Sequence, residues 1–338
     1  MDEGDHTECP IELLACPDHM DEQLRRMGYE PGTGNMPRRS EGVAGENFFK
    51  DSDGSRTVGF CLWCNKDFYT QVLLYRSNLD PQDILKELDK LEAGEDNRFT
   101  GTTEWIGNNF VGALLLIYEP HSRPCPFYAG FRTFCRLARA NLRHLLELCH
   151  KSIYAKADTG QLTFPISTEQ QAEAARQASA AFLGEIKSFG RQGNRLHTFV
   201  HRLGTLFQLA HQRPTQSEPE QSHFSVGTGT AQLVEDDIQF LNEAVKWSVL
   251  FEEEGTKKKD KYEPEAPDYV LNPIYAPYFH ISYRKKRKLE LKTDDVITLI
   301  RGNFEEVRAM LARFSRSWDV SPEQIAPTLF QDVSSEPQ

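Results

Sequence analysis

The chain has 338 residues, of which 39% are hydrophobic and 26% charged, and its formal net charge at pH 7 is −11. This length and composition are typical of a soluble globular protein with two or three compact domains, and they exclude a wholly disordered chain. The acidic balance argues against non-specific adhesion of the whole molecule to nucleic acid or to an anionic membrane, so such contacts need a locally basic surface.

Neither a membrane span nor a signal peptide is indicated. The longest apolar stretch, FVGALLLIY at 110–118, is too short to span a bilayer, and the first residues are acidic and polar. The seven cysteines are odd in number and scattered, unlike the disulfide framework of a small secreted domain. We therefore expect a cytoplasmic protein with reduced thiols and no membrane partner.

The N-terminal region, residues 1–109, is predicted to be rich in loops because Gly, Pro and Asn interrupt GYEPGTGNMPRRSEGVAGEN. One helix is predicted at DPQDILKELDKLEAGED, with Asp80 or Asp83 as its N-cap. One interpretation of the region is a zinc knuckle. The apolar stretch at 110–118 then predicts a buried strand or a short buried helix.

A zinc site is the one metal hypothesis. Cys61 and Cys64 form a C-x2-C knuckle, and Cys9, Cys16 and His19 are further candidate ligands, because tetrahedral Zn²⁺ takes four nitrogen or sulfur donors. The spacing of the upstream pair differs from that of a second knuckle. The alternative is that the cysteines are small buried hydrophobic side chains.

Residues 110–214 are predicted to be nearly all helical. In ARANLRHLLELCHKS, at 138–152, Arg143 and Glu147 lie four residues apart, the spacing of an exposed helical ion pair. The other interpretation is that Arg143 faces a nucleotide phosphate. STEQQAEAARQASAAFLGEIKSF, capped by Ser167 or Thr168, and RLHTFVHRLGTLFQLAHQ are predicted as core-facing helices.

Residues 215–312 are predicted as another domain. RPTQSEPEQSHFSVGTGT is interpreted as a polar linker, followed by a helix from VEDDIQ to near Glu252 and a lysine-rich turn. DYVLNPIYAPYF and FHISYR resemble strands, and this order is typical of a winged-helix domain. TDDVITLIRGNFEEVRAMLARF predicts terminal helices, and residues 313–338 are interpreted as a C-terminal tail.

Motifs of nucleotide hydrolysis and of common hydrolases are absent. The sequence has no G-x-x-x-x-G-K-[ST], no G-x-S-x-G and no H-E-x-x-H. GTGN at 32–35 and GTGT at 227–230 are interpreted as flexible loops, because neither is predicted to follow a strand and open a helix. ALLLIYEP, with Glu119 as the acid after its apolar run, is similar to a Walker B strand but has no P-loop partner. We expect no ATP hydrolysis by this chain alone, and ATP binding only with a partner chain.

Four stretches together resemble a known family: YAGFRTFCRLARANLRHLLELCHKSI, ISTEQQAEAARQAS, LHTFVHRLGTLFQLA and AVKWSVL followed by YVLNPIYAPYFHISYRKKRKLEL. They resemble the C-terminal half of bacterial P-loop ATPases of the origin-recognition AAA+ type, often grouped with STAND-type signalling and conflict-system ATPases. The resemblance covers roughly residues 110–312. It implies a mainly α (α+β) protein, with an AAA+-type helical lid, a winged-helix domain and a loop-rich N-terminal region. With this resemblance, the alternative to a zinc knuckle for residues 1–109 is a degenerate ATPase remnant.

The resemblance assigns roles to three residues at the start of the lid helix. In that family a Gly-Asn-x-Arg sequence opens the helix, and its arginine, the sensor-2 residue, approaches the γ-phosphate. Arg143 matches the arginine and Asn141 the helix-capping asparagine. Ala140 replaces the glycine, which puts the tight turn in question.

The resemblance also places basic residues on a DNA-binding surface, with GTKKKDK at the wing tip and YRKKRK after the second strand. Winged-helix proteins hold phosphates with such side chains while a helix enters the major groove. The candidate contacts are Lys246, Lys257, Lys258, Lys259, Lys261, Arg284, Lys285, Lys286 and Arg287. The alternative is a solvated charge run that acidic neighbours nearly cancel.

The leading hypothesis is a non-catalytic or degenerate regulatory relative of these ATPases. It would bind duplex DNA or a partner protein through the winged helix. The alternative is a subunit of a split ATPase of signalling or defence type, completed in trans when Arg143 meets ATP held by a partner chain. A third hypothesis is an adaptor that binds only proteins, such as an effector protein.

Overall fold

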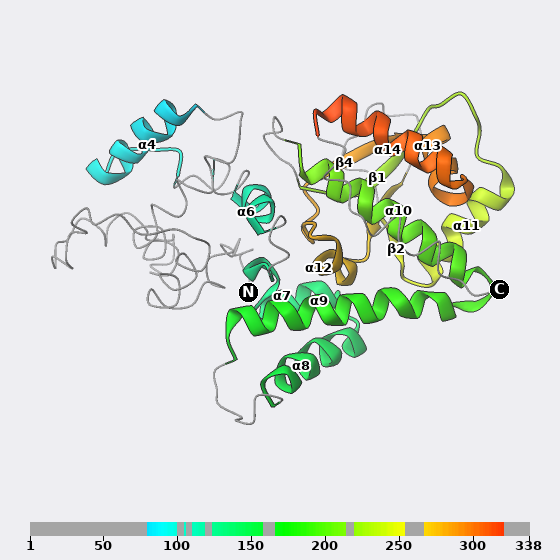
Figure 1. The fold of residues 1–338 in the computed structure, drawn as a ribbon, viewed down its shortest axis with the longest axis horizontal. Helices are drawn as coiled ribbons and strands as arrows, with labels where there is room; N and C mark the ends of the chain where they lie inside the picture. Colours follow the sequence, from blue (N-terminus) through cyan, green and yellow to red (C-terminus); the bar gives the residue numbers. More distant parts are fainter. Residues whose placement is uncertain are drawn as a thin grey trace, which may run out of the picture. The chain divides into compact units, whose positions relative to one another are not determined.

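The computed structural model describes residues 80–99, 105, 110–118, 124–157, 166–213, 220–253 and 267–320. The chain divides into two compact units, Met1–Ser122 and Arg123–Gln338. Within the described residues the fold is mainly α with one small sheet, as expected (Figure 1). Among the described helices, none combines the length and the apolar character that crossing a membrane requires.

The first unit contains α4 (Pro81–Ala93) and α6 (Phe110–Tyr118). The Asp80 side chain accepts a hydrogen bond from the backbone N–H of Gln82, and Gly94 ends α4 in the left-handed conformation. For the stretch at 110–118 the sequence left two alternatives, a buried strand or a short buried helix, and the structure has the helix. The comparison with a Walker B strand is wrong, because that motif needs an extended strand before its acid.

The helical part of the second unit runs from residue 124 to residue 213. Its elements are η3 (Pro126–Tyr128), α7 (Phe131–Ala138), α8 (Leu142–Ala157), α9 (Thr168–Glu185), η4 (Ile186–Ser188), η5 (Gly190–Gln192) and α10 (Gly193–His211). Ser167 caps α9 in a capping box with Gln170, which confirms the first of the two expected caps. Figure 1 shows α8 lying alongside α9.

The sheet part follows. It contains β1 (Gln221–Gly227), α11 (Glu235–Lys246), β2 (Leu250–Glu253), β3 (Asp268–Leu271), η6 (Pro273–Tyr275), α12 (Ala276–Phe279), β4 (Arg287–Lys292), α13 (Thr293–Arg301) and α14 (Phe304–Trp318). The strand order is β2-β3-β1-β4. β1 is antiparallel to β3 and parallel to β4.

Several expectations for this part are wrong in detail. The helix expected to reach Glu252 ends at Lys246, and β2 follows it. The stretch FHISYR is not a strand; the strand begins at Arg287. After Leu271, Pro273 begins a helical turn because its ring fits the first turn of a helix. α14 continues to Trp318, so the segment expected as a tail from residue 313 begins as helix.

The largest error concerns β1, which lies in the segment interpreted as a polar linker. Its polar residues are buried, among them Ser222, His223 and Ser225. Burial of such residues requires hydrogen-bonding partners, and Ser222 Oγ donates to the carbonyl of Arg284 at 2.8 Å. β1 lacks the alternating apolar pattern by which a strand is predicted, so it could not be recognised from its residues.

The helical and sheet parts of the second unit share buried contacts. Tyr128 Oη donates to the carbonyl of Ile281 at 2.8 Å, and the N–H of Ser282 donates to His211 Nε2 at 3.1 Å. Residues 124–213 and 220–320 therefore belong to one compact unit. The domain boundaries expected at 109, 214 and 312 stay predictions.

Candidate functional site

A strained turn joins α7 to α8. Arg139 and Ala140 both have positive φ angles, 43° and 61°, which non-glycine residues rarely adopt. The N–H of Asn141 donates to the carbonyl of Ala138 at 2.9 Å, closing the turn. The turn thus forms although alanine stands where the related ATPases have glycine.

Asn141 caps α8. Its Oδ1 accepts hydrogen bonds from the backbone N–H of Arg143 at 3.0 Å and of His144 at 3.4 Å. These N–H groups have no partner within the helix, and an asparagine at this position is among the most favourable caps. The cap fixes the start of α8 and so places Arg143 in its first turn.

The guanidinium of Arg143 forms a bidentate pair with Glu185 at the end of α9. The two N–O distances are 2.6 Å and 2.7 Å. The hydrogen bond and charge of Glu185 raise the pKa of Arg143 above its usual value. The expected pair with Glu147 is wrong; Glu147 instead lies 3.8 Å from Lys151 Nζ. The side chain of Arg143 is 67% exposed, so this pair is open to competition from solvent anions.

The basic run at 283–288 is largely paired with carboxylates. Arg284 binds the buried Glu220, with an Nε–Oε2 distance of 2.7 Å. Lys285 Nζ lies 2.6 Å from Glu253, and Lys288 Nζ lies 3.3 Å from Asp268. Lys286 and Arg287 are exposed, and no ion pair to either is found among the described residues.

The turn before α8 also contacts Glu253, the carboxylate that binds Lys285. Arg139 pairs with Glu253, and its guanidinium lies 3.9 Å from the centre of the Phe251 ring. Glu253 therefore binds both Arg139 and Lys285, which lowers the pKa of its carboxyl despite partial burial. Sequence reasoning missed this link because the two segments are far apart in the chain.

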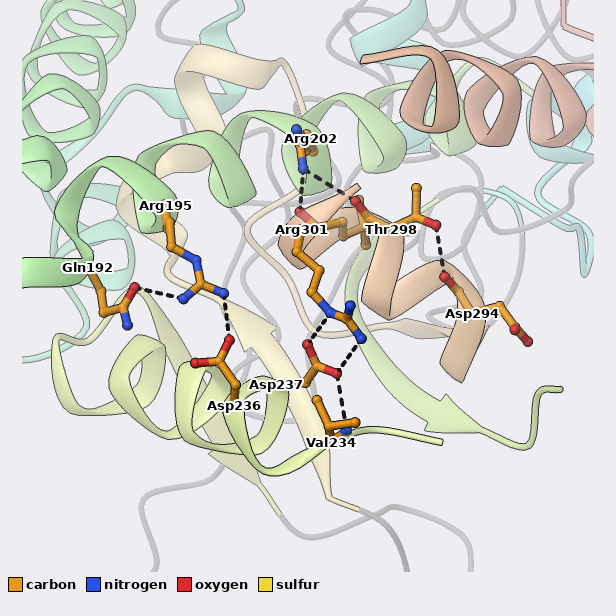
Figure 2. Close-up of polar contacts among 10 residues, drawn as sticks. Gln192, Arg195, Arg202, Val234, Asp236, Asp237, Asp294, Thr298 and Arg301 are labelled. Atoms are coloured by element: carbon orange, nitrogen blue, oxygen red, sulfur yellow. Dashed lines mark hydrogen bonds and ion pairs between the residues drawn. The ribbon is translucent and has the colours of Figure 1, made fainter. Parts of the chain in front are cut away.

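Three more arginines of the second unit are bound within it, as Figure 2 shows. Arg195 is held between Gln192 and Asp236, and Arg301 binds the buried Asp237 at 2.8 Å. Arg202, from α10, donates to the carbonyls of Thr298, Leu299 and Gly302 at the end of α13. None of these guanidinium groups is left for a ligand without breaking a contact.

The loop GTGT follows the strand β1 and precedes the helix α11. The sequence did not predict this strand–loop–helix context. It is not a flexible loop, because the Asp294 carboxylate accepts from the N–H and hydroxyl of Thr230, at 2.7 Å and 2.6 Å, and from the N–H of Ala231. Phosphate-binding loops use such N–H groups for the ligand. Here a carboxylate of the chain itself occupies them, and Glu235, Asp236 and Asp237 in the first turn of α11 oppose an anion.

The remaining candidates give less information. Lys246 is exposed and pairs with Glu243 at 3.0 Å. The four lysines of the expected wing tip lie outside the described residues; they are Lys257, Lys258, Lys259 and Lys261. The same holds for the zinc candidates, which are Cys9, Cys16, Cys61 and Cys64. The described cysteines, Cys125, Cys135 and Cys149, are free thiols. Within the described segments, no group of three or more His, Cys, Asp or Glu side chains has the arrangement of a metal site.

The described elements form a mainly α fold with a small sheet, which is consistent with an AAA+-like protein. The sequence model of the ORC-CDC6-like family matches residues 39–291, well over half of the chain, and the chain belongs to this family. The match supports the origin-recognition, AAA+-type relationship that the sequence indicated. No curated protein and no solved structure matches the chain significantly.

Proposed function

We propose that the chain is a catalytically degenerate, regulatory member of the ORC-CDC6-like family that binds duplex DNA through its C-terminal sheet part. The observation that carries this proposal is the family match over residues 39–291 in a chain without any G-x-x-x-x-G-K-[ST] motif. Without the lysine and hydroxyl of that motif, the chain has no means of its own to hold the phosphates and Mg²⁺ of ATP.

The sheet topology supports a winged-helix-like module. β2 and β3 form an antiparallel hairpin, and β3 also pairs with β1. The lysine-rich segment 254–266 connects β2 to β3, which is where a wing lies in such modules. Residues 228–249 are all described and contain one helix, α11, where a helix-turn-helix has two. The hairpin therefore provides the main contact, with phosphates rather than bases as its target.

Ion pairs with carboxylates reduce the number of basic residues that are available to contact DNA. Arg284 and Lys285 are held by Glu220 and Glu253, so Lys286 and Arg287 remain from that run. With the lysines of 257–261 they form a small basic surface on an acidic chain. Binding is therefore expected to be weak and strongly dependent on salt.

The test is retention of duplex DNA in low salt. The affinity should fall with a log–log salt slope of about −0.9 for each phosphate contact. Changing Lys257, Lys258 and Lys259 to Glu should weaken binding equally for all sequences. The charge-matched control changes the exposed Lys86, Arg308 and Arg316 to Glu and should have much less effect.

Two results would overturn the proposal. One is the absence of wild-type DNA retention in low salt, which would leave the partner-binding hypothesis. The other is ATP turnover by the purified chain with Mg²⁺, abolished by Arg143→Ala. Changing Lys246 tests a separate point, because an altered sequence preference would indicate that α11 enters the groove.

The second candidate function is completion of an active ATPase site in trans, favoured by the exposure of Arg143. A nucleotide held by another chain would compete with Glu185 for the guanidinium, since phosphate and carboxylate both accept two parallel N–H bonds. Combined with a P-loop partner, the chain should then stimulate ATP hydrolysis. Arg143→Ala should abolish the stimulation, and Arg308→Ala, which changes another exposed arginine, should not.

A further inference from the structure

An aromatic pair lies at the surface where the turn between α9 and α10 meets the end of α11. The rings of Phe189 and Trp247 stack with a centroid separation of 5.1 Å and an interplanar angle of 10°. Trp247 is 38% exposed, a large fraction for so big an apolar side chain. Neither member of the pair belongs to the basic segments that the DNA-binding hypothesis uses.

The indole of Trp247 is held in one orientation by two contacts. One is the stack on Phe189, and the other is the hydrogen bond from its Nε1 to Glu243 at 3.1 Å. Gly190 leaves room for the ring, because a Cβ on it would lie 3.3 Å from the indole. Gly190 also has a φ of 59°, so a side chain at this position is disfavoured twice. A fixed aromatic surface loses little entropy when a flat ligand stacks on it.

Cations flank both members of this pair in the sequence, and carboxylates of the same elements are already bound. Lys187 and Arg191, two residues on either side of Phe189, are exposed, and no ion pair to either is found in the described part of the chain. Glu243 binds Lys246 and Trp247, and Glu185 binds Arg143. Asp236 binds Arg195, as Figure 2 shows. Lys187 and Arg191 therefore leave a local positive charge on an acidic protein.

We propose that Trp247, Phe189, Lys187 and Arg191 form a stacking site for single-stranded nucleic acid. An unpaired base stacks on the indole, and the flanking phosphates contact Lys187 and Arg191. Proteins that bind single strands without sequence preference combine these same two features, aromatic platforms and a positively charged surface. The site goes beyond the proposed duplex contact, and it does not require the lysines at 257–261.

The experiment titrates the full chain with an oligothymidine of about 12 nucleotides, within the range of known single-strand sites. The readout is tryptophan fluorescence, and subtraction of the Trp247→Phe spectrum isolates the emission of Trp247. Quenching of that emission is expected. Trp247→Ala should weaken binding about tenfold or more, and Trp247→Phe, which keeps an aromatic ring, should weaken it less.

A second variant keeps the test valid if Trp247→Ala fails to fold. Lys187→Glu with Arg191→Glu changes only exposed side chains and should reduce the log–log salt slope by about 1.4, the value for two single-strand contacts. The control, Arg308→Glu with Arg316→Glu, carries the same charge change on α14 and should leave the slope much closer to the wild-type value.

The outcomes separate this site from the proposed duplex contact. Changing Lys257, Lys258 and Lys259 to Glu should leave oligothymidine binding nearly unchanged while duplex retention falls. Absence of quenching, or unchanged affinity in both the Trp247→Ala and the Lys187→Glu/Arg191→Glu variants, would overturn the proposal. So would a shift of Trp247 emission with protein concentration alone, which would make this surface a contact between copies of the chain.

Discussion

Among single residues, the carboxylates determine which basic side chains are available for ligands. Arg143, Arg284 and Lys285 were all candidates from the sequence, and each pairs with a carboxylate at least 32 residues away in the chain. A sequence shows local spacing, so it favoured Glu147 as the partner of Arg143. The residue types at the site were predictable, but their partners depend on packing between distant elements.

The strained turn before α8 gives the first prediction. Ala140→Gly should raise the free energy of unfolding by about 0.5–1 kcal/mol, because relief of the positive φ outweighs the greater freedom of glycine in the unfolded chain. Urea denaturation measures the change. Arg139→Gly is the comparison: it relieves similar strain but removes the contacts with Glu253 and Phe251, so it should destabilise the protein. A loss of stability in Ala140→Gly would contradict the argument.

The second prediction concerns the buried His211. Burial lowers the pKa of His211 from 6.5 to about 4, and its neutral ring donates from Nδ1 to the Phe207 carbonyl while Nε2 accepts from Ser282. The unfolded chain takes up the proton first, so this contribution to stability is complete above about pH 6.5 and is lost as the pH falls towards 4. At pH 5 the loss is about 2 kcal/mol.

His211→Gln removes this titration while its amide can replace both hydrogen bonds. Urea denaturation between pH 4 and pH 6.5 should show a shallower dependence than in the wild type, by up to about 1.4 kcal/mol per pH unit. Burial also lowers the pKa of His223 to about 4, so some dependence remains in the variant. An unchanged slope would show that His211 does not titrate in this range.

At the scale of elements, the helices were more predictable than the strands, of which the expected strand-like stretch DYVLNPIYAPYF contains β3. Periodic apolar residues and capping side chains predicted α4, α9, α10, α13 and α14, because these features are local. β1 was not predicted because it contains the polar residues Ser222, His223 and Ser225, whose burial depends on partners from other segments. Without β1, the loop GTGT could not be recognised as the connection between a strand and a helix.

That loop gives the third prediction. A Cβ on Gly229 would collide with Thr293 Oγ1 and Asp294 Oδ2, whereas one on Gly227 would meet only the Leu291 carbonyl at 3.5 Å. Gly229→Ala should therefore displace the loop from Asp294 and speed hydrogen exchange at the N–H groups of Thr230 and Ala231. Gly227→Ala is the matched control and should leave that exchange unchanged. Equal exchange in the two variants would contradict this account.

At the scale of the whole molecule, the lid-like helices and the sheet, which the sequence assigns to two domains, share buried contacts within the second unit. The second unit, Arg123–Gln338, contains both the lid-like helices and the sheet. Arg202 of α10 caps α13, and the N–H of Tyr278 donates to Ser179 of α9 at 3.1 Å. The composition shift near residue 214 marks a change of secondary structure, and composition alone does not distinguish that from a change of domain.

The last prediction follows from this shared core. Residues 123–213 expressed alone should show no cooperative unfolding transition, because Leu203 and Phe207, both fully buried in the chain, would lose much of their packing, and His211 would lose Ser282. A fragment of residues 123–320 should keep the transition. In the full chain, core amides of α9 and β1 should exchange with the same opening free energy in mild denaturant. If α9 stayed protected after β1 had exchanged, the two parts would be separate domains, with a boundary near 214 as the sequence indicated.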